Sequence, residues 1–432
     1  MDNYKLGTRL LNFINNSPTA FHAVNTTEDI LLKNNFKELK EDEQWNLEKQ
    51  GKYYVKRNNS AIIAFVMGKE SVVENGFKII GSHTDSPTFR IKPDAEMSVE
   101  NKYLKLNTEV YGGPILNTWM DRPLSIAGRV ILKSNDIMNP VQKFININKP
   151  ILIIPNLAIH MNRAVNQGFE INPQKHTLPL AKVITENMEK ENYLLNLVAK
   201  ELEVNKEEIL DFDLFLYEYE KGCLMGEDNE FISSGRLDDL SMVHASLEAI
   251  TETEVSKATN VMVAFDNEEV GSATKQGADS MFLDSILERI VEKEDESREA
   301  YFRALAKSFI ISSDLAHALH PNFTEKNDLT SKPIINKGPV IKVSARQSYT
   351  SDSFSSSIYE QICNEAGVPV QRFVNRSDER GGSTIGPISS THISIPSVDI
   401  GSPVLAMHSV REFGGVLDHK YIIESFKKFY SI

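Results

Sequence analysis

Residues 261–272, VMVAFDNEEVGS, decide the fold that we expect for this chain. The five consecutive apolar residues 261–265 predict a strand buried on both faces, as in a parallel sheet. The strand runs directly into the polar residues 266–269, and ligands of open α/β sheets collect outside the carboxyl ends of strands. Adjacent carboxylates repel one another unless a cation or a proton compensates their charge. A solvated acidic turn is the simpler explanation of an isolated glutamate pair, so the rest of the sequence has to decide.

Length and charge limit the classes of protein that fit. The chain has 432 residues, which predicts two domains or one domain with a large insertion. A formal net charge of −13 argues against nucleic acid or an anionic membrane as the main partner. The contents of 41% hydrophobic and 25% charged residues are ordinary for a soluble globular protein.

The cysteines and the apolar runs indicate the compartment. Cys223 and Cys363 give no disulfide framework, which fits a reducing environment. No apolar run approaches the roughly 20 residues that span a bilayer, and the first residues lack the apolar segment of a signal peptide. We expect a cytoplasmic protein.

The pattern along the chain predicts an α/β domain with an insertion. Helices are expected at 6–13 and 20–35, a hairpin at 52–67 and a strand at 77–81. In residues 93–234 the sequence pattern predicts mainly strands, with one helix near 192–202. From residue 235 the alternation of helices and strands resumes. The predicted helices and strands of this later part are listed by residue: helices 240–250, 281–306, 353–366 and 421–429, and strands 309–313, 340–343, 370–374 and 395–400. We expect residues 1–92 and 235–432 to form one domain and 93–234 an inserted, mostly β domain.

Four more apolar strands or helix starts lead to side chains that can bind a metal. The residues are His83 and Asp85, Asp238 and Asp239, Asp314, and His408. Each alone has a simpler explanation, such as a histidine satisfied in the core or a carboxylate favoured by a helix N-terminus.

Taken together, these residues suit a site for two divalent metals. Imidazole and carboxylate ligands fit zinc, manganese or cobalt, and each ion needs about three protein ligands and an open position. Two histidines, two aspartates and one glutamate make two sets of three if one aspartate bridges. The second glutamate is then free to act as a general base on a water between the metals.

At this point the sequence resembles a known family, the M18 aspartyl aminopeptidases, which are dinuclear metallopeptidases. The resemblance covers nearly the whole chain, in family order. It is carried by five blocks, HTD at 83–85, RLD at 236–238, DNEEVGS at 266–272, SDLAHALHPN at 313–322 and AMHSVRE at 406–412, and by LAIH at 157–160 and KGPVIK at 337–342.

The resemblance implies a role for each metal-competent residue. His83, Asp238 and Asp314 would hold one metal, and Asp238, Glu269 and His408 the other. Glu268 would be the general base.

Two carboxylates near these ligands have other roles. Asp85 would orient His83, although a capping aspartate in a turn before Pro87 is the simpler alternative. Many relatives have asparagine where this chain has Asp239, which is expected to stay outside the ligand set and to cap the helix.

The resemblance also implies substrate contacts, namely His160, His317, His320, Lys342, Gly382 and Ser383. His160 resembles a residue that reaches from the inserted domain into a neighbouring subunit's active site. Lys342 is a candidate cation for an acidic side chain. Without the resemblance, His160 is a surface histidine, Lys342 is a solvated lysine, and the spacing of His317 and His320 suggests a second metal site.

The implied protein is a cytosolic aminopeptidase with two divalent metals, most simply zinc, and a preference for N-terminal Asp or Glu. Its fold would be a phosphorylase/hydrolase-like three-layer α/β domain, and the insertion would mediate dimerisation within a tetrahedral dodecamer. The sequence has neither HExxH nor GxSxG, which excludes helix-borne zinc proteases and the common serine hydrolases. A metal aminopeptidase or deacylase of non-acidic specificity, or a non-catalytic assembly protein, remains the alternative.

Overall fold

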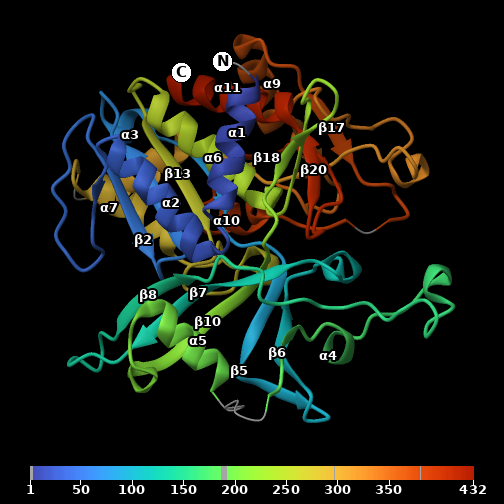
Figure 1. Cartoon of the computed structure of the whole chain (residues 1–432). Helices are drawn as coiled ribbons and strands as arrows, with labels where there is room; N and C mark the ends of the chain where they lie inside the picture. Colours follow the sequence, from blue (N-terminus) through green and yellow to red (C-terminus); the bar gives the residue numbers. More distant parts are fainter. Residues whose placement is uncertain (1–2, 186–191, 296, 380) are drawn as a thin grey trace. The chain divides into compact units, whose positions relative to one another are not determined.

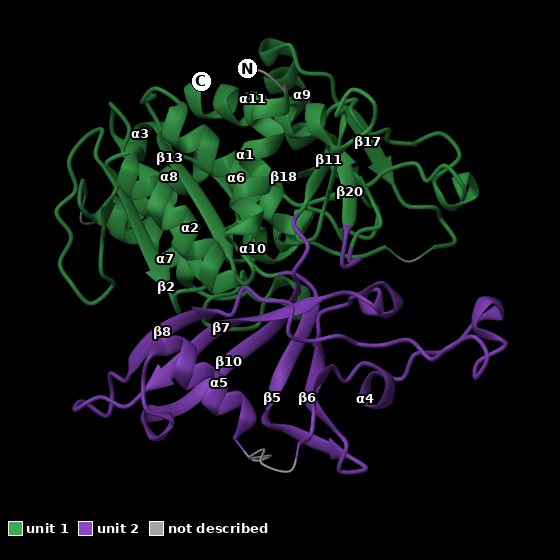
Figure 2. Cartoon of the chain, in the orientation of Figure 1, with its two compact units in different colours: residues 1–85, 222–407, 412–432 green, residues 86–221, 408–411 purple. Residues whose placement is uncertain are grey.

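The computed structural model describes residues 3–185, 192–295, 297–379 and 381–432 and divides into two compact units (Figures 1 and 2). Unit 1 comprises Met1–Asp85, Gly222–Met407 and Glu412–Ile432, and unit 2 comprises Ser86–Lys221 and His408–Arg411. Each unit has its own sheet and its own hydrophobic core. The dimerisation role of residues 93–234 stays a prediction.

The main sheet of unit 1 is built around the strand that the opening stretch predicts. In the described part of the chain its nine strands follow the order β1-β2-β3-β13-β4-β14-β18-β16-β17. β13, Thr259–Phe265, is buried along its whole length and pairs in parallel with β4, Phe77–His83. β4 in turn pairs in parallel with β14, Phe309–Ser313, and β14 with β18, Ser397–Gly401. The predicted buried parallel strand is confirmed, and the carboxyl ends of four strands meet at one edge of the sheet.

The other strands of this sheet flank the parallel set. The predicted hairpin is confirmed as two antiparallel strands, the second of which pairs with β13. The flanking strands are β1 (Lys37–Glu38), β2 (Lys52–Arg57), β3 (Ala61–Val66), β16 (Val340–Val343) and β17 (Gln371–Val374).

Helices cover both faces of the sheet (Figure 1). Successive side chains of a strand point to opposite faces, so a strand of apolar residues gives the sheet two apolar faces to bury. In β13, Met262 and Ala264 join one core cluster, whereas Val261, Val263 and Phe265 join the other. The first cluster includes residues of α1 (Asn3–Asn15), α2 (Ala20–Lys33), α6 (Leu237–Glu252), α9 (Ser353–Ala366) and α11 (Val416–Ser431). The second includes residues of α3 (Val72–Asn75), α7 (Phe282–Glu292), α8 (Arg298–Ala306) and α10 (Ile385–Ile393). The predicted three-layer α/β architecture is confirmed.

One predicted helix is wrong. The sequence predicts a single helix over 281–306, but the chain forms α7 and α8 with a break between them. The side chain of Ser297 accepts a hydrogen bond from the N–H of Ala300 at 3.2 Å and caps the start of α8. A serine cap stabilises a new helix start rather than the continuation of the preceding helix.

A smaller sheet in unit 1 holds the segments that follow β14 and β18. Among the described residues its order is β11-β12-β20-β19-β15. Its strands are β11 (Cys223–Met225), β12 (Phe231–Ser234), β15 (Ala316–His317), β19 (Pro403–Leu405) and β20 (Glu412–Gly415). Two short 3-10 turns of this unit are η4 (Glu268–Val270) and η5 (Thr324–Lys326).

Unit 2 is mostly β, as the sequence of the insertion predicts. Its described residues form a six-stranded antiparallel sheet in the order β8-β7-β10-β5-β6-β9. The strands are β5 (Thr88–Val99), β6 (Tyr103–Tyr111), β7 (Leu124–Leu132), β8 (Val141–Asn146), β9 (Leu180–Val183) and β10 (Ile209–Glu218). The helices are α4 (Pro173–His176), the predicted α5 (Tyr193–Leu202), and the 3-10 turns η1 (Leu116–Trp119), η2 (Val165–Gln167) and η3 (Lys206–Glu208). Side chains of α5 join the core of this sheet.

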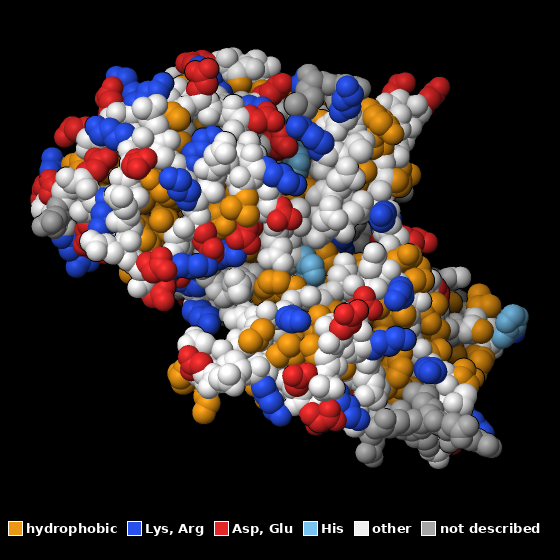
Figure 3. Space-filling model, turned by 60° about the vertical axis from the view of Figure 1, so that its left-hand side comes forward, with side chains coloured by type: hydrophobic (Ala, Val, Ile, Leu, Met, Phe, Trp, Pro, Cys, Tyr) orange, Lys and Arg blue, Asp and Glu red, His pale blue; other side chains and the backbone are white. Residues whose placement is uncertain are grey.

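The visible surface carries both signs of charge. Figure 3 shows acidic and basic side chains interspersed over one face of the molecule. Among the helices that the structure describes, none combines the length and the apolar character needed to cross a bilayer.

Candidate metal centre

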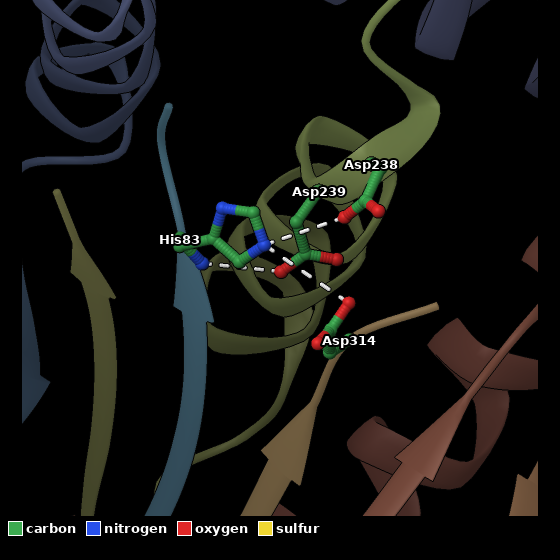
Figure 4. Close-up of side chains that lie close together, drawn as sticks. All are labelled: His83, Asp238, Asp239 and Asp314. Carbon is green, nitrogen blue, oxygen red and sulfur yellow. Dashed lines mark hydrogen bonds and ion pairs between the residues drawn. The ribbon is translucent and has the colours of Figure 1, made fainter. Parts of the chain in front are cut away.

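Three elements of unit 1 bring one histidine and three aspartates together (Figure 4). His83 is the last residue of β4, and Asp314 directly follows the neighbouring strand β14. Asp238 and Asp239 lie at the start of α6, and the peptide bond between them is cis. All four side chains are buried. The cluster therefore lies at the carboxyl edge of the parallel strands, where the sequence predicts it.

The donor atoms of these four residues converge on one point. His83 Nε2 is 3.3 Å from Asp238 Oδ1 and 4.0 Å from Asp314 Oδ1. One donor atom from each of the four residues lies within 4.8 Å of every other. This spacing suits oxygen and nitrogen ligands that surround a single ion.

The two glutamates that follow β13 approach the same histidine. His83, Glu268 and Glu269 also offer three donor atoms within 4.8 Å of one another. Both glutamates lie in the short turn η4, where they occupy adjacent positions. The acidic cluster after β13 thus belongs to a group that could hold a metal, which favours a metal site over a solvated acidic turn.

Asp85 connects His83 with both glutamates. Its Oδ1 is 3.4 Å from His83 Nδ1, and its backbone oxygen is 3.1 Å from the same nitrogen. The backbone N–H groups of Glu268 and Glu269 donate to its two carboxylate oxygens at 3.1 and 3.2 Å. The resemblance implies only the contact with His83. The carboxylate also holds the turn that presents the glutamates, which the sequence does not reveal.

Asp239 does not cap the helix as expected. Its Oδ2 accepts the backbone N–H of His83 at 3.1 Å, and its side chain belongs to the cluster. The other oxygen, Oδ1, is buried and accepts no hydrogen bond from any residue that the structure describes. A buried oxygen of this kind is costly unless a cation or a proton occupies the space beside it.

Glu412 is a residue of the site that sequence reasoning missed. It is buried in β20, and its Oε2 accepts the backbone N–H of Asp238 at 3.0 Å. The only signal in the sequence is its place at the end of the block 406–412. The contact fixes the backbone from which the Asp238 carboxylate projects.

The site without a cation has to hold protons. Burial opposes the charged form of His83, but Asp239, Asp238, Asp85 and Glu268 raise its pKa well above the usual value. Burial, with the carboxylates around it, raises the pKa of Glu268 to about 8 and that of Glu269 well above its usual value. Burial raises the pKa of Asp239 in the same way, although His83 opposes this shift. Because divalent cations favour the ionised forms of these groups, the donor set fits a metal of the zinc, cobalt or manganese type.

His408 and His160 belong to unit 2. The Nδ1 of His408 lies 3.1 Å from the backbone oxygen of Gly113, and the backbone oxygen of His408 accepts the N–H of Ile115. His160 is exposed. The predicted roles of His408 as a metal ligand and of His160 in a neighbouring active site stay predictions.

Lys342 is not the solvated lysine that its place in a strand suggests. It is only 2% exposed, and its Nζ donates to the backbone oxygen of Leu315 at 3.0 Å. The same nitrogen is 3.8 Å from Asp314 Oδ2 and lies over the ring of Tyr349. Burial disfavours its charge, but Asp314 and Asp399 raise its pKa above the usual value.

His317 and His320 line a hollow in unit 1 of about 310 Å³, together with Lys326, Phe373 and Met407. His317 packs edge to face against Phe373, and the Nδ1 of His320 accepts the N–H of Asn322 at 3.1 Å. Within the described residues, no group of three metal donors contains either histidine. The structure does not support the second metal site that their spacing suggests.

Gly382 and Ser383 lie in an exposed segment before α10. A side chain at Gly382 would meet no atom within 4 Å, so its backbone is open to approach. Ser383 Oγ donates to the backbone oxygen of Ser348 at 3.2 Å.

Comparison with known proteins identifies the family. The family described as "Aminopeptidase I zinc metalloprotease (M18)" matches residues 13–430. The chain belongs to the M18 family of aminopeptidases. It is 65% identical over 428 residues to a probable M18 family aminopeptidase 2 of Clostridium novyi, and the match covers 99% of both chains.

Solved structures agree with this M18 assignment. The Ape4 chain in a complex with Nbr1 matches with a TM-score of 0.95 and 37% identity, covering 99% of this chain and 86% of that one. An S. cerevisiae mApe1 dodecamer matches with a TM-score of 0.85 and 27% identity, covering 98% and 96%. This M18 protein is therefore a metallo-aminopeptidase of a zinc-dependent family, with a buried cluster able to hold metal.

The zinc affinity of the metal-free M18 protein should rise with pH. At pH 7 the raised pKa values of Glu268 and His83 leave both groups protonated, and a bound cation has to displace those protons. Calorimetric titration with zinc in two buffers of different ionisation enthalpy should show proton release. Glu268→Gln should release fewer protons, and binding without net proton release would contradict the expected charge state.

The stability of the metal-free protein should fall as the pH rises, whereas its zinc affinity should increase. The pKa of Glu268 rises from 4.5 to about 8 on folding, so between these values the folded chain holds more protons than the unfolded chain. Its free energy of unfolding therefore falls as the pH rises through this window. Thermal unfolding at pH 5 and pH 8 should show that zinc raises the midpoint more at pH 8.

Proposed function

We propose that this M18 aminopeptidase is a dinuclear exopeptidase that removes an N-terminal Asp or Glu from peptides. The observation that supports it most directly is that His83 belongs to two groups of possible metal donors, a buried one with Asp238 and Asp314 and a second one with the half-buried Glu268 and Glu269. The family supplies the aminopeptidase activity. The number of ions and the acidic preference are the proposal.

The ligands can be divided between two ions. His83, Asp238 and Asp314 would hold one ion, and Asp238, Glu269 and His408 the other. When bound, two divalent ions would polarise the scissile carbonyl and lower the pKa of a water between them. The high density of buried carboxylates supports two ions rather than one, because a single ion leaves more of their charge uncompensated.

Glu268 is proposed to carry the proton. It accepts one proton from the water that attacks the first peptide carbonyl and gives it to the amine that leaves when the C–N bond breaks. Burial raises the pKa of Glu268 to about 8 in the metal-free site, which supports its proposed role as a base. A metal nearby would lower this value towards the working pH. Asp85 keeps the carboxyl in place by holding the N–H of the same residue.

The acidic preference follows from the resemblance and from Lys342. In the metal-free site the ammonium group compensates Asp314 at 3.8 Å. A cation on Asp314 would leave Asp399 as the remaining carboxylate near Lys342. The positive charge of Lys342 would then be less fully compensated and would favour an acidic substrate side chain. His317, His320, Gly382 and Ser383 are proposed as further substrate contacts.

Assembly is proposed from the structural relatives. The S. cerevisiae protein with this fold is a dodecamer, and we propose that this chain also forms a homo-oligomer, with His160 reaching a neighbouring site. A cytoplasmic location is proposed because both cysteines are free thiols.

The adjacent glutamates allow a matched test of the two roles. Glu268→Gln should retain zinc and lower kcat by roughly a hundred- to ten-thousandfold, the range for loss of a general base. Glu269→Gln should lose part of the zinc at equal total metal, because a ligand is removed. Metal analysis and initial rates on the same preparations separate the outcomes, and zinc retention in both variants with equal loss of kcat would contradict the division.

The substrate preference is tested with aminoacyl anilides. With zinc, cobalt or manganese added, kcat/KM for Asp- and Glu-anilides should exceed that for Leu- and Ala-anilides by at least about tenfold, or about 1.4 kcal/mol. Lys342→Met should reduce this ratio towards one. A wild-type preference for Leu would overturn the acidic assignment while leaving the metallo-aminopeptidase intact.

The oligomer is tested by mass. Light scattering on the zinc-loaded protein should give a particle of about twelve times the 48.7 kDa chain. A monomer at micromolar concentration would overturn the proposed assembly. His160→Ala should then lower kcat/KM without changing this mass.

A further inference from the structure

Asp399 lies in β18 at the centre of a buried polar network that has no part in the mechanism described so far. It is fully buried, and its carboxylate accepts three hydrogen bonds from described residues. Ser312 Oγ and Thr384 Oγ1 donate to Oδ1 at 2.6 and 2.7 Å, and the N–H of Thr350 donates to Oδ2 at 2.6 Å. Three segments of unit 1 that are distant in sequence therefore meet on one carboxylate.

Two of these segments carry residues on the substrate side of the proposed site. Thr384 caps α10 and directly follows Gly382 and Ser383. Thr350 directly follows Tyr349, whose ring lies under the ammonium group of Lys342. The two segments also contact each other, because Ser383 Oγ donates to the backbone oxygen of Ser348. Their relative position is thus fixed at the carboxylate and at one further hydrogen bond.

The start of α10 packs tightly against Asp399 and Thr350. A Cβ built on Gly386, in the first turn of α10, would lie 2.5 Å from Asp399 Oδ2 and 2.3 Å from the side chain of Thr350. The backbone of Asp399 adds a second connection, since its N–H donates to Ser351 Oγ at 2.9 Å. The backbone at Gly386 therefore lies directly against the side chains of Thr350 and Asp399.

The charge of Asp399 also fits this position. All three partners of the carboxylate donate, so the ionised form satisfies them without a proton. Burial raises the pKa of Asp399, and Lys342 opposes that shift. Two buried carboxylates, Asp399 and Asp314 of the metal centre, thus favour the charged form of Lys342.

We propose that Asp399 is a positioning residue for substrate binding, which holds the 348–350 loop and the 382–384 segment at a fixed separation beside Lys342. The inference rests on the proposed function. It adds a residue that touches neither metal nor substrate but sets the width of the site for the N-terminal residue of the peptide. A residue with only a structural role would affect stability, whereas a positioning residue affects KM more than kcat.

Asp399→Asn and Thr384→Val test this directly. In Asp399→Asn, one carboxylate oxygen becomes an NH₂ group, which cannot accept a hydrogen bond from the donors of the network. Thr384→Val removes the hydroxyl that donates to Asp399, with little change in volume. Each should raise KM for an Asp-anilide by about tenfold, or about 1.4 kcal/mol, with zinc content unchanged and kcat lowered by less than a few-fold. Thr384→Ser, which keeps the hydroxyl, should retain the wild-type KM.

Asp418→Asn is the matched control. Asp418 is also fully buried, and its carboxylate accepts the N–H groups of Asn336 and Gly338 at 2.5 and 2.8 Å. The control should lower the unfolding midpoint and leave KM unchanged. Hydrogen exchange measured by mass spectrometry should increase at 345–350 and 382–386 in Asp399→Asn but not in Asp418→Asn.

The outcomes separate this inference from the proposed function. A wild-type protein that cleaves no anilide overturns both. With an active wild type, an unchanged KM in the folded Asp399→Asn and Thr384→Val variants overturns only the positioning role. A KM that rises equally in Asp418→Asn also overturns it, because general loosening would then explain the effect.

Discussion

The repulsion among buried carboxylates is the constraint on which the rest of unit 1 depends. Asp238, Asp239 and Asp314 lie around one imidazole, and Glu268 and Glu269 approach it from a neighbouring turn. Without a cation, such a group persists only in partly protonated form, which the raised pKa values express. The chain therefore folds around a site that is incomplete by itself. A divalent metal would supply the missing charge, and the chain belongs to a family of zinc metalloproteases.

The parallel sheet allows many charged side chains to gather at one edge while the cores on its two faces stay apolar. Because β13, β4 and β14 run in the same direction, their carboxyl ends deliver donors to one edge while their apolar side chains fill two separate cores. The cores hold the strands rigidly. The donor residues therefore lie at the strand ends or close beyond them. Asp314, for example, is the first residue after β14. Rigid elements position functional side chains more precisely than long loops do.

Most of this arrangement could be predicted from the sequence, because strand ends followed by His, Asp or Glu are a local pattern. The buried strand and the hairpin follow from such patterns, whereas the grouping of His83, Asp238 and Asp314 was implied by the family resemblance. What failed depends on contacts between distant segments. The burial of Lys342 against Asp314 and the bond from the Asp238 amide to Glu412 have no local signature. The break between α7 and α8 was missed because helical periodicity on both sides outweighed a single serine cap.

Asp85 touches the imidazole of His83 with one oxygen and the amides of both glutamates with its carboxylate. One side chain therefore contacts both the imidazole and the turn that carries the two glutamates. The orientation of the imidazole and the position of both glutamates are thus coupled through a single carboxylate. A change at residue 85 would disturb all three groups at once.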